Sequence, residues 1–152
     1  NHINKIVSGE NKIVANKIKM FYSKFIKNVY VSKSIEEAEM IKLFRNNYLS
    51  IKVSFCNEIA EFCNRKEICY ENVRKLAVLD KRIGESHTNV PGHDGKNGYG
   101  GTCFPKDTNN LKCEMAKINM KSYIIDGAVE RNEIVDRPEK DWNANKGRAV
   151  VG

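Results

Sequence analysis

The stretch SIEEAEMIKLFRNNYLSIKVSFCNEIAEFCN, residues 34–64, decides the fold of this 152-residue chain. It contains neither proline nor glycine, and its apolar residues recur at the three- and four-residue spacing of one helix face. Ser34 and Glu37 form a capping-box pattern at its start. We therefore predict a long core helix from residue 35 to about residue 64. The apolar stripe consists of Ile35, Ala38, Ile41, Phe44, Leu49, Phe55, Ile59 and Phe62.

Strand signals precede this helix. Residues 5–8 and 28–32 are short runs rich in β-branched residues, and residues 12–25 between them carry apolar residues at helical spacing. This order of strand, helix and strand is typical of the last unit of a parallel sheet.

The pattern after the long helix is helical, with one long interruption. Residues 64–67 predict a turn and a second helix follows to about residue 79, whereas residues 84–101 have the composition of a loop. Further helices are predicted over residues 104–117 and 122–136, and residues 149–152 indicate the start of a strand. The fold class expected from the residues is therefore mainly α, with a strand-helix-strand unit in front.

The charge and the cysteines exclude several classes of protein. The net charge of +7 is spread along the chain without interleaved aromatic residues, which suits a nucleotide-sized anion but predicts no nucleic-acid partner. The apolar stretches are short and interrupted by charges, so no membrane partner is expected. The five cysteines match no zinc spacing, so no metal is expected, and their odd number without a secretory signal indicates the cytoplasm.

The segment GYGGTCFPKD, residues 98–107, carries the strongest chemical signal. Its glycines allow a tight turn and a close approach of the backbone to a ligand. Pro105 suits the first turn of a helix, whose positive N-terminal end, together with Lys106, would stabilise a thiolate at Cys103. We therefore predict that Cys103 is a nucleophile, and the alternative is a small buried cysteine beside a structural turn.

A second, weaker signal lies on the long helix. Lys42 and Asn46 are four residues apart, so they project from one helix face and can hydrogen-bond one oxygen atom between them. Such pairs are also common on solvated helices, which is the alternative interpretation.

Taken together, these segments resemble a known family. AEMIKLFRNNYLSIKVSFCNEIAEFC (residues 38–63), LDKRIG (residues 79–84) and GYGGTCFPKD occur in the order found in the UDP-glucose 6-dehydrogenases, a group within the NAD-dependent nucleotide-sugar dehydrogenases. The resemblance covers nearly the whole chain. It implies three parts: residues 1–33 as the end of a Rossmann-like NAD-binding domain, residues 34–121 as the central helical dimerisation and catalytic domain, and residues 122–152 as a connecting helix with the start of a UDP-binding domain.

The resemblance also implies roles for individual residues. Cys103 would be the nucleophile that carries the thiohemiacetal and thioester, Lys42 and Asn46 would hold the reacting oxygen, and Asp107 would position the lysine and water. Arg82 would reach the sugar site of a neighbouring subunit, and the substrate would be wrapped by the loop Asp94, Gly95, Lys96, Asn97, Gly98, Tyr99 and Gly100. The cofactor NAD would contact Cys103, Phe104, Pro105 and Lys106.

The chemistry of such an oxidation agrees with this set of residues. Oxidising an alcohol to an acid removes two hydrides, and an aldehyde has no hydride to give until a nucleophile has added to it. The chain carries no G-x-G-x-x-G motif after a strand, so we expect it to be a fragment that is inactive alone. The implied reaction converts UDP-glucose to UDP-glucuronate, in a homodimer built through the long helix.

Three alternatives stay open. The substrate could be another nucleotide sugar, such as GDP-mannose or a UDP-N-acetylhexosamine. Cys103 could instead serve a thiol hydrolase, activated by His87 or His93. The chain could also be a basic helical module that only dimerises or binds an anion.

Overall fold

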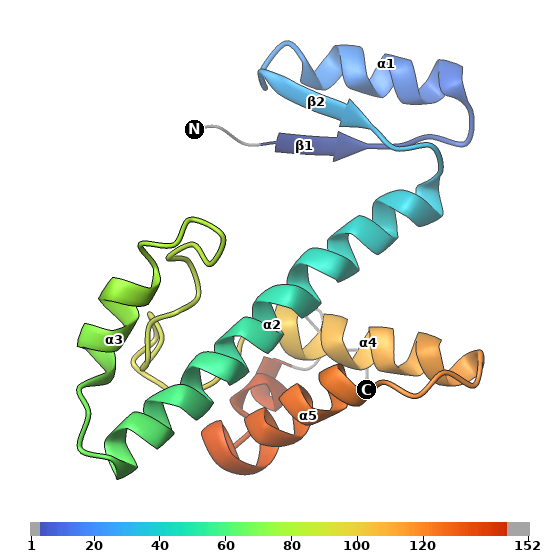
Figure 1. Cartoon of the computed structure of the whole chain (residues 1–152). Coiled ribbons are helices and arrows are strands. Elements are labelled where there is room, and N and C mark those ends of the chain that lie inside the picture. Colours follow the sequence, from blue (N-terminus) through green and yellow to red (C-terminus); the bar gives the residue numbers. More distant parts are fainter. Residues whose placement is uncertain (1–3, 146–152) are drawn as a thin grey trace. The chain divides into compact units, whose positions relative to one another are not determined.

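The computed structural model describes residues 4–145 of the chain. It is mostly helical with one small sheet, in the order β1, α1, β2, α2, α3, α4, α5 and the short helical turns η1 and η2 (Figure 1). The predicted fold class is confirmed, whereas the strand predicted at residues 149–152 lies outside the described residues. Contacts divide the chain into two compact units, Asn1–Arg45 and Asn46–Gly152. The three expected domains stay a prediction.

The first unit contains a strand, a helix and a second strand. β1 (Asn4–Val7) and β2 (Asn28–Val31) pair in parallel, and α1 (Lys12–Tyr22) connects them. The side chain of Asn11 caps α1 by accepting a 3.0 Å hydrogen bond from the amide of Val14. The three predicted elements are present, although α1 ends three residues before the predicted end.

The long helix α2 (Ile35–Arg65) begins and ends close to its predicted bounds. Its start is capped as expected: Ser34 Oγ accepts a 3.1 Å hydrogen bond from the amide of Glu37. The carboxylate of Glu37 reaches one residue farther back than in the usual capping box, and accepts from the amide of Lys33 at 2.5 Å. After the predicted turn, α3 (Tyr70–Ala77) follows.

The buried face of α2 in the second unit is polar. Asn47, Ser50, Ser54 and Asn57 recur at three- and four-residue spacing and are each at most 4% exposed. Ser54 Oγ, for example, donates a 3.0 Å hydrogen bond to the carbonyl of Ala128 in α5. Hydrogen-bonding side chains therefore occupy the packed face of α2, and three phenylalanines of the predicted apolar stripe lie on its exposed surface. Phe44, Phe55 and Phe62 are 65%, 61% and 55% exposed.

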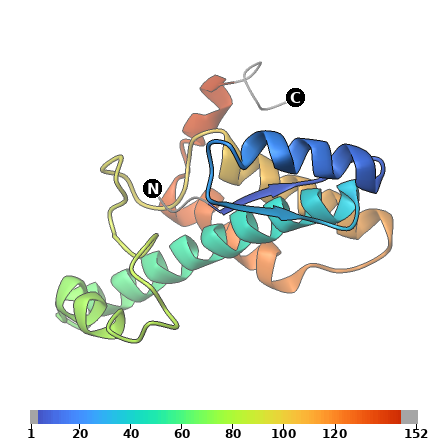
Figure 2. The ribbon, with the colours of Figure 1, turned by 90° about the horizontal axis from the view of Figure 1, so that it is seen from above.

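The remaining helices of the second unit follow a long irregular loop that joins α3 to α4 (Figures 1 and 2). α4 (Cys103–Lys117) begins one residue earlier than predicted, and α5 (Tyr123–Arg131) ends five residues earlier. The residues after α5 widen into the π-helical turn η1 (Asn132–Asp136), and η2 (Asp141–Asn145) is a 3₁₀ turn. Among residues 4–145, no helix is both long enough and apolar enough to cross a membrane.

Candidate functional site

The loop between α3 and α4 is attached to both α2 and α3. Lys52 on α2 donates hydrogen bonds of 2.9 and 2.8 Å to the carbonyls of Ile83 and Gly84. Farther along, the Tyr70 hydroxyl donates to the carbonyl of Thr88 at 2.7 Å. These bonds fix the irregular backbone that leads to the glycine turn.

Two glycines of this turn are required by close packing. Gly98 has a φ of +66°, and a Cβ atom on it would lie 2.3 Å from Asn132 Oδ1. A Cβ atom on Gly100 would lie 1.8 Å from Arg137 Nη1. The amide of Gly98 donates a 3.2 Å hydrogen bond to Asn57 Oδ1 on α2. The glycine pattern in the sequence therefore reflects a backbone pressed against buried polar side chains.

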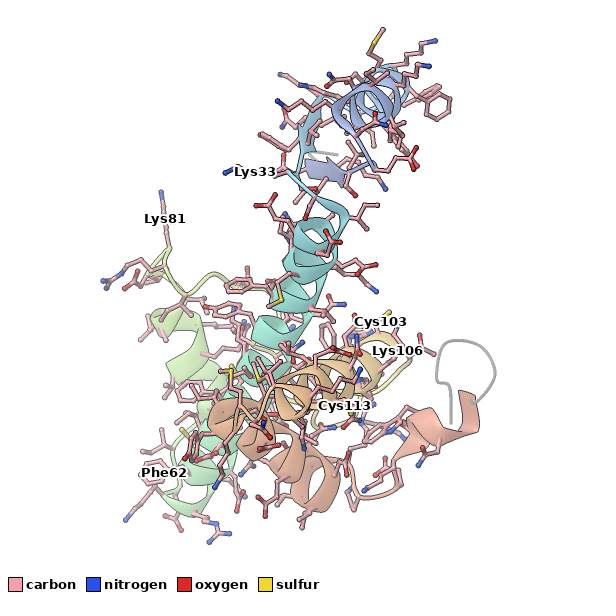
Figure 3. The ribbon with its side chains drawn as sticks, turned by 90° about the vertical axis from the view of Figure 1, so that its right-hand side faces the viewer. Lys33, Phe62, Lys81, Cys103, Lys106 and Cys113 are labelled. Atoms are coloured by element: carbon pink, nitrogen blue, oxygen red, sulfur yellow. The ribbon has the colours of Figure 1, made fainter. Side chains whose placement is uncertain are left out.

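Cys103 is the first residue of α4 and is exposed. Figure 3 labels it with Lys106 at the same end of the helix and Cys113 farther along. Its position at the start of a helix agrees with the sequence-based prediction. The structure thus excludes the alternative of a buried structural cysteine at this position.

A cavity of about 630 Å³ lies beside Cys103. Its volume is typical of small-molecule sites. The residues that line it are Val53, Ser86, His87, Asn89, Gly92, His93, Asp94, Gly98, Tyr99, Gly100, Gly101, Thr102, Cys103 and Phe104. Six residues predicted to bind substrate or cofactor, or to react, are therefore brought together around one space.

Tyr99 is the most buried aromatic residue of this lining. It is 4% exposed, and its ring packs edge-on against Phe104 with centroids 6.0 Å apart. Burial raises the pKa of its hydroxyl to about 12, so the phenol is neutral at physiological pH. The predicted substrate contact of Tyr99 is thus accompanied by a structural role in the cavity wall.

The carboxylate of Asp107 joins the first turn of α4 to α2. Asp107 is 2% exposed, and its Oδ2 accepts a 2.5 Å hydrogen bond from Asn46 Nδ2. Its backbone carbonyl accepts from Asn47 Nδ2 at 3.1 Å, and Lys106 Nζ lies 3.5 Å from Oδ1. Two of the predicted catalytic residues, Asn46 and Asp107, are therefore in direct contact. Their catalytic roles stay predictions.

Several predicted site residues lie outside the Cys103 cavity. Lys96 forms ion pairs with Glu139 at 3.0 Å and Asp141 at 2.9 Å. Asn97 lines a separate cavity of about 310 Å³ next to α2. Gly95, at a φ of +75°, and Pro105, which is buried in α4, also lie outside the Cys103 cavity lining, as do Lys106, Asn46 and Asp107.

The predicted roles of Arg82, at the sugar site of a neighbouring subunit, and of Lys42, at the reacting oxygen, are not tested by the structure. Arg82 is 89% exposed and pairs with Asp80 at 2.5 Å, so its side chain is accessible. Lys42 lies one turn before Asn46 on α2 but belongs to the first unit of the chain. Both roles stay predictions.

Sequence reasoning did not find the buried partners of the glycine turn, namely Asn57, Asn132 and Arg137. The regular spacing of polar residues on α2 could have indicated Asn57, whereas nothing in the sequence marks Asn132 or Arg137 as buried.

The sequence analysis named His87 and His93 as alternative activators of Cys103, and both line its cavity. Burial, assisted by the charges of Lys52 and His93, lowers the pKa of His87 below its ordinary value of 6.5, so this imidazole is neutral at pH 7.

Comparison with known proteins identifies the family of this chain. A family model described as the central domain of the UDP-glucose/GDP-mannose dehydrogenase family matches residues 36–134, which include the helix α2, the glycine turn and Cys103. The chain belongs to this family.

Individual relatives agree with this assignment. The chain is 34% identical to the UDP-glucose 6-dehydrogenase of Campylobacter jejuni over 133 residues, which cover 86% of this chain and 32% of the relative. It is 34% identical to the UDP-glucose 6-dehydrogenase TuaD of Bacillus subtilis over 125 residues, which cover 79% and 26%. A UDP-glucose dehydrogenase structure from Pyrobaculum islandicum matches with a TM-score of 0.76 and 26% identity, over 84% of this chain and 28% of that one. The chain spans less than a third of each of these relatives.

Proposed function

We propose that the complete protein is an NAD-dependent dehydrogenase that oxidises UDP-glucose to UDP-glucuronate through a covalent intermediate on Cys103. The observation that carries this proposal is the position of Cys103: it is exposed at the N-terminus of α4 and lines the 630 Å³ cavity. The named relatives, which are UDP-glucose 6-dehydrogenases, support the choice of substrate.

The proposed role of Cys103 belongs to the second half of the oxidation. Its thiolate adds to the carbon of the intermediate aldehyde, so that a C–S bond forms and the carbonyl electron pair moves onto oxygen. Loss of hydride from the same carbon leaves a thioester. Water then attacks the thioester carbonyl, the C–S bond breaks, and the carboxylate product and the thiolate are released.

The proposed role of Lys42 and Asn46 is to stabilise the oxygen that becomes negative in these steps. An ammonium and an amide N–H aimed at a developing oxyanion lower the barrier by several kcal/mol at most. Asn46 is held by its 2.5 Å hydrogen bond to the buried carboxylate of Asp107, which fixes the orientation of the amide. In this proposal Asp107 positions Lys42 and the water molecule that hydrolyses the thioester.

NAD would accept the two hydrides, and the residues at the start of α4 fit such a cofactor. Phe104 lines the cavity beside Cys103 and offers an apolar ring, while Lys106 is 37% exposed and offers a positive charge. Cys103, Phe104, Pro105 and Lys106 would therefore contact the cofactor. The rest of its binding site would come from other parts of the complete protein, because this chain lacks a G-x-G-x-x-G motif after a strand.

We also propose a homodimer built on α2. Phe55 and Phe62 are more than half exposed on this helix and lie seven residues apart, so they share one face. An exposed aromatic stripe of this kind suits a second copy of the same helix, related by a two-fold axis.

The proposal is tested by incubating the complete protein with UDP-glucose and NAD. Two NADH molecules should form for each UDP-glucuronate. GDP-mannose and a UDP-N-acetylhexosamine, assayed in parallel, should be turned over much more slowly. A faster reaction with either sugar would assign the protein to the other branch, and no reaction with all three would overturn the proposed function.

A further inference from the structure

The segment that follows α5 and the helix α2 both bind the loop of residues 94–100. From α2, Asn57 Oδ1 accepts a hydrogen bond from the Gly98 amide. The segment after α5 contributes Asn132, at the start of the π-helical turn η1, and Arg137, just after its end. Both side chains are 1% exposed, which is rare for an asparagine and an arginine.

Asn132 binds the backbone of Tyr99 in both directions. Its Oδ1 accepts a 2.8 Å hydrogen bond from the Tyr99 amide, and its Nδ2 donates a 2.9 Å hydrogen bond to the Tyr99 carbonyl. The side-chain amide of Asn132 thus makes to the Tyr99 backbone the two hydrogen bonds that a neighbouring strand would otherwise make. The missing Cβ of Gly98 provides the space, since that atom would lie 2.3 Å from Asn132 Oδ1.

Arg137 uses its guanidinium group on three partners. Its Nε donates a 3.0 Å hydrogen bond to the carbonyl of Asn97, and its Nη2 pairs with Asp94 Oδ2 at 2.7 Å. Its Nη1 lies 3.5 Å from Asp141 Oδ2 and packs against the backbone of Gly100. The planar fork of an arginine can hold these positions at once, whereas a lysine ammonium cannot.

The contacts of Asn132 and Arg137 alternate along the loop. Arg137 holds residues 94 and 97, Asn132 holds residue 99, and Arg137 again confines residue 100. Asp94, Tyr99 and Gly100 also line the cavity beside Cys103. The shape of that cavity wall therefore depends on two buried side chains that do not themselves line the cavity.

We propose that Asn132 and Arg137 are positioning residues, which set the shape of the 94–100 loop for the nucleotide-sugar substrate. This inference rests on the proposed function for the identity of the substrate. The position of the loop does not rest on it. Neither residue needs to touch the substrate, because each acts through the loop backbone.

The first experiment measures the loop itself and needs no activity. Amide hydrogen exchange over residues 94–103 of the complete protein is compared between wild type, Arg137→Lys and Lys140→Gln. Arg137→Lys keeps the positive charge but loses the planar guanidinium group and its several donors. Amide hydrogen exchange in residues 94–103 should therefore become faster. Lys140→Gln is the matched control in the same segment, since Lys140 pairs with Glu133 outside the loop, and should leave the exchange unchanged.

The second experiment is kinetic. For Arg137→Lys, we expect kcat/KM for UDP-glucose to fall about 10- to 100-fold, as for a misplacement of about 1 Å, with KM for NAD unchanged. Arg137→Ala should behave likewise, and millimolar guanidinium, but not sodium at equal ionic strength, should restore part of its activity.

The outcomes separate this inference from the proposed function. Unchanged hydrogen exchange in Arg137→Lys would overturn the inference even if the enzyme is active. A parallel rise of KM for both ligands would also overturn it, because the arginine would then serve only the fold. A wild-type protein that leaves UDP-glucose untouched would overturn the proposed function alone, and the exchange experiment would still decide the role of the arginine.

Discussion

The contact between Asn46 and Asp107 leads to a prediction whose magnitude follows from the structure. Asn46→Ala removes the 2.5 Å donor to Asp107 Oδ2, and Asp107 is 2% exposed. A hydrogen bond to a charged group contributes roughly 1.5–3 kcal/mol to the free energy of unfolding. Lys106, 3.5 Å from the other carboxylate oxygen, remains in place. We therefore expect a loss of about 2 kcal/mol in the free energy of unfolding.

A loss of this size lowers the melting temperature by about 4–8 °C in a protein of 150–250 residues, and by less in a larger one. The assay is thermal unfolding followed by circular dichroism. Asn109→Ala is the matched control: it makes the same substitution at an exposed position of α4, and it carries the same gain in helix propensity. The Asn109→Ala control should change the free energy of unfolding by less than about 0.5 kcal/mol. Equal melting temperatures for the two variants would show that the hydrogen bond from Asn46 to Asp107 does not stabilise the fold.

Three further predictions concern other parts of the chain. Arg82→Ala in the complete protein should raise KM for UDP-glucose and leave KM for NAD unchanged, and an equal loss for both ligands in steady-state kinetics would point to a folding defect instead. Hydrogen bonds from Arg74 lower the pKa of Glu71 to about 2, so the stabilisation that Glu71→Gln removes should be present above pH 4.5 and vanish as the pH falls toward 2 in urea titrations. Phe62→Glu should convert the proposed dimer to a monomer in light scattering, whereas Tyr123→Glu, at a residue 74% exposed on α5, should not, and a dimer in both would place the interface elsewhere.

The sequence predicts the helices well because their signals are local. Ser34 and Glu37 mark the start of α2, and the lack of proline and glycine allows it to continue for 31 residues. The end of α5 was not predictable in this way. Its last residues continue the helical pattern, but Asn132 turns its amide toward Tyr99, and the backbone widens into a π-helical turn there.

The candidate site was predictable where a motif is contiguous and not where it depends on tertiary contacts. The segment GYGGTCFPKD indicates Cys103, the turn and the helix start without further information. The burial of Arg137 follows from its ion pair with Asp94, 43 residues earlier, and no local pattern carries such a pairing. The polar packed face of α2 was not predicted for the same reason, since the partners of Asn57 and Ser54 lie far away in the sequence.

The central claim is that Cys103 forms the covalent bond required for the second hydride removal and not for the first. The most direct measurement supplies Cys103→Ala, in the complete protein, with either the 6-aldehyde of UDP-glucose and NADH or the aldehyde and NAD. We expect the variant still to reduce the aldehyde, seen as a loss of NADH absorbance, while almost no UDP-glucuronate forms from the aldehyde and NAD. Acid production close to the wild-type rate would contradict it.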